Sequence, residues 1–66
     1  MTAAFGLIMT SASRIEHESS IGFMQEHPEH SQNHLNGFFA QVKENGLVIK
    51  HIDVSRPGFI TYIAEA

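Results

Sequence analysis

The pattern of apolar and polar residues predicts one clear helix in the middle of the chain, over residues 29 to 45. Apolar residues recur there at the i, i+3, i+4, i+7 spacing of a helix with one buried face, at Leu35, Phe38, Phe39 and Val42. Pro28 suits the first turn of such a helix, because the N–H of a first-turn residue has no partner within the helix. Gly46 suits the position just beyond its end, where the backbone commonly turns left-handed.

Sequence patterns typical of β-strands lie on both sides of this helix. Loose alternation of apolar residues predicts a strand over residues 3 to 12. After the helix, two stretches rich in β-branched and aromatic residues, 47–54 and 59–65, predict the strands of a hairpin. Residues 56 to 59 (RPGF) match a turn with proline at its second position and glycine at its third.

Residues 14 to 27 fit two different structures. Ser13 and Glu16 have the spacing of a helix capping box, and Pro28 would end a helix just before it. The segment is poorly amphipathic, however, and a strand at residues 21 to 25 is the alternative. We expect the helix and leave the strand open.

Together these elements predict a single small α+β domain over residues 1–66, with a three-stranded sheet and the helices on one face. The expected core residues are Phe5, Leu7, Leu35, Phe38, Phe39, Val42, Ile52, Ile60 and Tyr62. A chain this short buries only about 60% of its unfolded surface, and such domains usually need a disulfide, a metal or a partner subunit. The chain has no cysteine, so a histidine-bound metal or a subunit interface remains.

The last predicted strand is apolar on both faces, which favours self-association. One helix can cover only one face of a sheet, so the other face needs a second helix or another subunit. Gly37 also suggests a neighbouring chain, because glycine inside a helix costs about 1 kcal/mol relative to alanine. A kink in the helix and a tolerated surface glycine are the alternatives. We expect a homodimer with these interface residues: Gly37, Arg56, Phe59, Ile60, Tyr62 and Ile63.

Three of the five histidines fall within the stretch HPEHSQNH, at His27, His30 and His34. On a helix these side chains share one flank, and the i, i+4 spacing of His30 and His34 allows two imidazoles to hold one divalent metal. Zinc, nickel and copper(II) all suit imidazole ligands. A solvated first turn of the helix is the alternative, since the HExxH pattern of metalloproteases is missing from the sequence.

Charge and motifs exclude several classes of function. The net charge of −3 argues against a nucleic-acid-binding surface, which needs a basic footprint. The apolar N-terminal stretch is short and lacks basic residues, so we expect neither a signal peptide nor a membrane span, and a cytoplasmic protein. The sequence also has no nucleophile elbow, P-loop or dinucleotide-binding glycine motif.

These observations rank three functions. The first is a small non-enzymatic protein-interaction or regulatory module, such as an inhibitor, that acts as a homo-oligomer or binds a larger protein complex. The second is a divalent-metal-binding protein that uses His30 and His34, with His27 as a third ligand. The third is a small enzyme whose site is shared between subunits, because one domain of this size has little room for a pocket.

Overall fold

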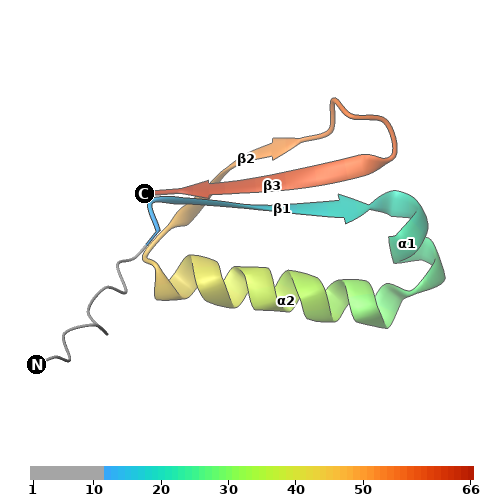
Figure 1. Ribbon diagram of the computed structural model, residues 1–66, viewed down its shortest axis with the longest axis horizontal. Coiled ribbons are helices and arrows are strands. Elements are labelled where there is room, and N and C mark those ends of the chain that lie inside the picture. Colours follow the sequence, from blue (N-terminus) through green and yellow to red (C-terminus); the bar gives the residue numbers. More distant parts are fainter. Residues whose placement is uncertain (1–11) are drawn as a thin grey trace, which may run out of the picture.

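The computed structural model describes residues 12–66, which form a three-stranded antiparallel sheet with two helices on one face (Figure 1). The elements in chain order are β1 (Arg14–Ser20), α1 (Ile21–Glu26), α2 (Pro28–Glu44), β2 (Val48–Asp53) and β3 (Phe59–Glu65). The sheet has the order β1-β3-β2, so the last strand lies between the other two. The predicted small α+β fold is confirmed.

Helix α2 and the hairpin form where the sequence predicts them. Gly46 follows α2 with a φ of 67°. The N–H of Leu47 donates to the carbonyl of Val42 at 2.9 Å, which completes the usual glycine-terminated helix end. In the hairpin turn Gly58 has a φ of 83°, and the N–H of Phe59 donates to the carbonyl of Arg56 at 3.1 Å.

The helix predicted within residues 14–27 is wrong for its first half. Residues 14–20 form β1, which pairs with β3 from Arg14 opposite Glu65 to Ser20 opposite Phe59. Pairing with the central strand gives the backbone groups of every second residue a partner, as a helix would otherwise have done. The alternative strand at 21–25 is also wrong, because that segment lies in α1.

The capping residue of this first helix is Ser20 rather than Ser13. The hydroxyl of Ser20 accepts a hydrogen bond from the N–H of Phe23 at 3.3 Å, which is the usual function of an N-cap serine. The strand predicted at residues 3–12 lies outside the described residues except for Ala12, and Ala12 is not in a strand.

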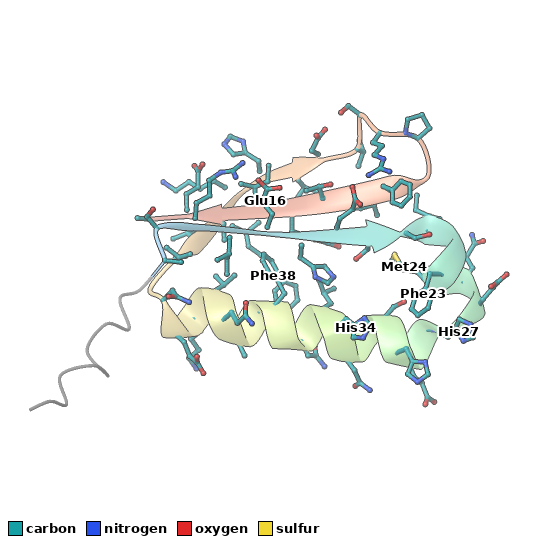
Figure 2. The ribbon with its side chains drawn as sticks, in the orientation of Figure 1. Glu16, Phe23, Met24, His27, His34 and Phe38 are labelled. Atoms are coloured by element: carbon teal, nitrogen blue, oxygen red, sulfur yellow. The ribbon has the colours of Figure 1, made fainter. Side chains whose placement is uncertain are left out.

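The core is thin. In the described part of the chain the buried hydrophobic side chains are Phe38, Val42, Leu47 and Ala64. Leu35 and Tyr62 pack against them as predicted, and Phe5 and Leu7 lie outside the described residues. Figure 2 shows Phe38 between α2 and the sheet.

Two residues predicted for the core are exposed instead. The exposed fraction is 60% for Ile52 and 39% for Phe39. At the start of β2, Leu47 and Ile49 join the core, whereas Ile52 at the far end of the strand does not. Among the described residues, the core therefore covers the first residues of β2 and leaves its far end open.

Candidate functional site

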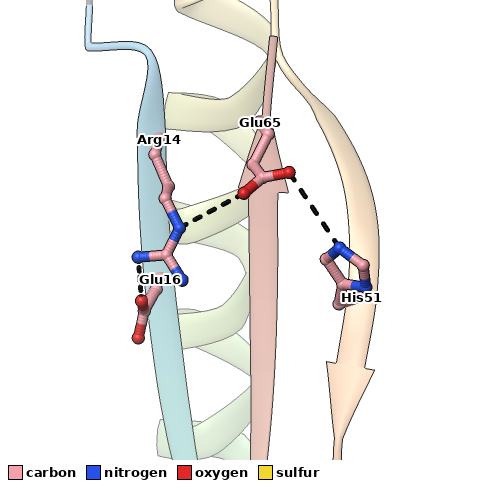
Figure 3. A network of polar contacts seen from close by, with 4 residues as sticks. All are labelled: Arg14, Glu16, His51 and Glu65. Carbon is pink, nitrogen blue, oxygen red and sulfur yellow. Dashed lines mark hydrogen bonds and ion pairs between the residues drawn. The ribbon is translucent and has the colours of Figure 1, made fainter.

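The face of the sheet away from the helices is charged. Arg14 Nε donates to Glu65 Oε2 at 3.3 Å, and His51 Nε2 lies 4.0 Å from Glu65 Oε1 (Figure 3). Arg14 also pairs with Glu16. These side chains are well exposed, and exposed pairs of this kind contribute at most about 1 kcal/mol each. These charged pairs make this face of the sheet hydrophilic.

Two of the predicted interface residues, Phe59 and Arg56, contact each other on this face. The guanidinium of Arg56 lies 4.1 Å from the centre of the Phe59 ring, and its Nη1 donates to Glu18 Oε2 at 2.7 Å. Ile63 lies on the same face, opposite His51 and Glu16 of the two edge strands. The apolar stripe of β3 is therefore flanked by charged and polar side chains and is half-buried.

An apolar surface lies instead on the helix side of the sheet, beside β2. Tyr62 pairs with Ile52 across the strands, and the Phe39 ring meets the Tyr62 ring edge-on with centroids 6.3 Å apart. We call Phe39, Ile52 and Tyr62 the β2 shelf. Of the predicted interface residues, Tyr62 belongs to it and Ile60 points to the same side of the sheet.

The opposite flank of α2 forms a groove with β1, which we call the β1–α2 groove. It contains two adjoining pockets of about 300 and 400 Å³, and His17 and His34 line both. The first pocket is completed by Glu18, Ser19, Ser20, Phe23 and Ser31. The second is completed by Glu16, Asn33, Gly37, Phe38 and Gln41.

His17 is held in place by aromatic rings. Its imidazole stacks on Phe38 with centroids 5.4 Å apart, and the Tyr62 ring lies 6.4 Å away. Burial lowers the pKa of His17 below its ordinary value, and the nearby His34 lowers it further. The neutral form of His17 is therefore favoured at neutral pH.

The three histidines of the HPEHSQNH stretch divide between two neighbourhoods. The His27 ring lies 5.9 Å from the His30 ring and 4.9 Å from the Phe23 ring. The His34 ring lies parallel to Phe23 at 6.4 Å and lines the groove with His17. Over residues 12–66, no group of three or more His, Cys, Asp or Glu side chains is placed to hold a metal ion. The metal site at His27, His30 and His34 stays a prediction.

Two residues of the groove, His17 and Ser31, are not among the site residues predicted from the sequence. The Ser31 hydroxyl is buried, and no hydrogen-bond partner for it lies within the described residues. His17 follows Ile15 and precedes Ser19 at the two-residue spacing of one strand face. That spacing would have placed His17 against α2 only if residues 14–20 had been assigned to a strand.

Comparison with protein-family models finds no match for the chain, and comparisons with curated proteins and with solved structures find none either. In the part of the chain that the structure describes, neither helix has the length and apolarity to cross a membrane. The two flanks of α2 are therefore interpreted from their own geometry.

Proposed function

We propose that the protein is a non-enzymatic protein-interaction module that acts as a homodimer joined across the β2 shelf. The observation that supports this is the exposure of Ile52 on the side of the sheet that elsewhere forms the core. A large apolar side chain in this position loses the contacts and the burial that a covering element would provide. The second layer over β2 is the part of the fold that a partner would supply.

The small core also supports a dimer, because it contributes little stability to the single chain. The chain has no cysteine, and the four buried hydrophobic side chains of residues 12–66 include one alanine. Domains of this size commonly gain the missing stability by oligomerisation. Burial of one apolar side chain contributes roughly 1.5–3 kcal/mol when it is complete, and a two-fold interface buries each residue twice.

The shelf is suited to a second copy of the same chain. It combines a helix residue, Phe39, with a strand residue, Ile52, and both are substantially exposed. A two-fold axis can place Phe39 of each protomer against Ile52 of the other, because such an interface pairs residue i with residue j and j with i. A different protein bound at the shelf is the competing outcome.

Strand β2 provides a matched pair of variants for the test. Ile52 and Val48 are 60% and 57% exposed, but they lie on opposite faces, because Val48 pairs with Glu65 of the charged face. Light scattering over a wide concentration range should give a dimer mass for the wild type and for Val48→Lys. Ile52→Lys should give the 7.3 kDa monomer with unchanged helical circular dichroism.

Two results would contradict the proposal. One is a wild-type chain that remains a 7.3 kDa monomer at the highest concentration reached. The other is a dimer that both lysine variants retain, since the shelf would then lie outside the interface.

A further inference from the structure

The outer edge of β1 borders the β1–α2 groove. At the two ends of β1, the carbonyl of Ser13 accepts from the N–H of Ala66, and the N–H of Ile21 donates to the carbonyl of Gly58. Odd-numbered residues therefore direct their backbone groups toward β3 and its turn. Backbone direction alternates along a strand, so Glu16 and Glu18 direct their N–H and C=O groups to the outer edge.

This edge is open to another strand. Within residues 12–66, β1 pairs with β3 on one side and with no strand on the other. An edge of this kind is a template for an added strand, and peptide-binding proteins use it in that way. Strand addition supplies main-chain hydrogen bonds, and pockets beside the edge supply selectivity for side chains.

The two pockets of the groove lie where side chains of an added strand would point. Each pocket is lined by His17, on the helix side of β1, and by a glutamate whose side chain belongs to the charged face: Glu18 in one and Glu16 in the other. A pocket that touches both faces must reach the edge of the strand. Every second side chain of a segment laid along that edge would therefore face α2.

Gly37 lines the second pocket on the helix side, and because it has no side chain it leaves this pocket more open. A Cβ atom built at Gly37 meets no atom within 4 Å, so packing among the described residues does not require glycine here. Glycine nevertheless costs about 1 kcal/mol in a helix relative to alanine. The space beside Gly37 is therefore free for an incoming chain.

The first pocket contains polar groups that can receive an anionic side chain. The Ser31 hydroxyl is buried without a partner among the described residues, and the imidazoles of His17 and His34 lie near it. The other groups that face His17 are the rings of Phe38 and Tyr62. A carboxylate could accept hydrogen bonds from all three polar groups.

The charged side chains around the groove leave room for an anionic side chain in the first pocket. Glu18 is paired with Arg56, and Glu16 with Arg14, on the opposite face of the sheet. Burial lowers the pKa of His17, and the nearby His34 lowers it further, because like charges repel. A carboxylate bound beside His17 would oppose both effects and favour the charged form of its imidazole.

We propose that the β1–α2 groove binds an extended segment of a partner protein by strand addition to β1, with an acidic side chain of the segment between His17, His34 and Ser31. This site is independent of the β2 shelf, because the two lie on opposite flanks of α2. An experiment that disproves one of the two proposals therefore leaves the other unaffected.

The test is a titration of the ¹⁵N-labelled chain with the capped peptide acetyl-Thr-Val-Thr-Glu-Thr-Val-Thr-amide, followed by backbone amide shifts. The largest shifts are expected at Glu16 and Glu18, whose N–H groups point outward. Peptides with glutamine or lysine in place of the glutamate should bind about tenfold more weakly, since they lose a charge-assisted hydrogen bond. Binding of the glutamate peptide should be tighter at about pH 6 than at about pH 8, because it favours a protonated histidine.

Two helix variants provide the matched control. Gly37→Leu and Ala40→Leu each enlarge a small exposed residue of α2, but only Gly37 borders the groove. Gly37→Leu should weaken binding about tenfold while the melting temperature stays the same or rises, because leucine favours the helix. Ala40→Leu should bind as the wild type does. His34→Ala, at an exposed position, should remove the preference for glutamate over glutamine.

Several outcomes would overturn the proposal. They are shifts confined to β2, equal binding of the glutamate and glutamine peptides, and no shift up to millimolar peptide. Unchanged binding by a folded Gly37→Leu variant would also exclude the groove as the site.

Discussion

Replacing Phe38 with alanine should remove a large part of the stability of this protein. Phe38 is 5% exposed, and its ring lies 5.4 Å from His17, 6.0 Å from Phe39 and 6.3 Å from Tyr62. A buried Phe→Ala change costs about 3–5 kcal/mol, because it removes apolar contacts and leaves a cavity. At about 0.05–0.15 kcal/mol per residue, a domain of this length has only about 3–10 kcal/mol in total.

The measurement is urea unfolding followed by circular dichroism, with Phe39→Ala as the control. Phe39 is the adjacent residue of the same type, but it is 39% exposed, so it has less contact to lose. At low protein concentration Phe38→Ala should be close to unfolded in water, and Phe39→Ala should unfold at a midpoint nearer the wild type. Equal losses for the two variants, or a larger loss for Phe39→Ala, would refute the assignment of the core.

The remaining predictions concern pH and the backbone. Because the folded-state pKa of His17 is lowered from 6.5, the unfolded chain binds its proton first, and the contribution of this residue to stability falls as the pH drops through 6.5. His17→Gln should therefore show a smaller loss of melting temperature between about pH 7.5 and 5.5, and an unchanged pH profile would contradict this. Gly58→Ala should lower the free energy of unfolding by about 1–2 kcal/mol, because alanine is strained at a φ of 83°. Gly37→Ala should raise it by up to about 1 kcal/mol, and urea midpoints that moved in the opposite directions would show that the backbone argument fails.

Two parts of the fold could be predicted from the sequence because their signals are local. Helix α2 combines apolar residues at helical spacing with Pro28 at its start and Gly46 just beyond its end, and these features act within a few residues of one another. The hairpin turn likewise depends on Gly58, whose left-handed conformation is easy for glycine alone. The small α+β class followed from these elements.

Strand β1 could not be predicted in the same way. Its sequence, RIEHESS, contains one large apolar residue, Ile15, and its Ser13–Glu16 spacing resembles a helix start. The segment becomes a strand because β3, which lies far away in the chain, pairs with it along its whole length, from Arg14 opposite Glu65 to Ser20 opposite Phe59. Helix α1 then begins at Ile21, directly after the cap residue Ser20, where that pairing ends.

The sequence by itself determined where helix α2 and the hairpin lie, and that the small core would leave apolar surface uncovered. Only the tertiary structure decided which surface that is. Phe38 and Phe39 belong to the same predicted apolar stripe, yet Phe38 is buried and Phe39 is exposed as part of the β2 shelf. The position of α2 across the sheet depends on where β1 ends and β2 begins, and this long-range arrangement also places His17 of β1 beside His34 of α2. The periodicity of apolar residues within one segment shows which of its faces is apolar. Which other segment packs against that face is decided by contacts between segments that are far apart in the chain.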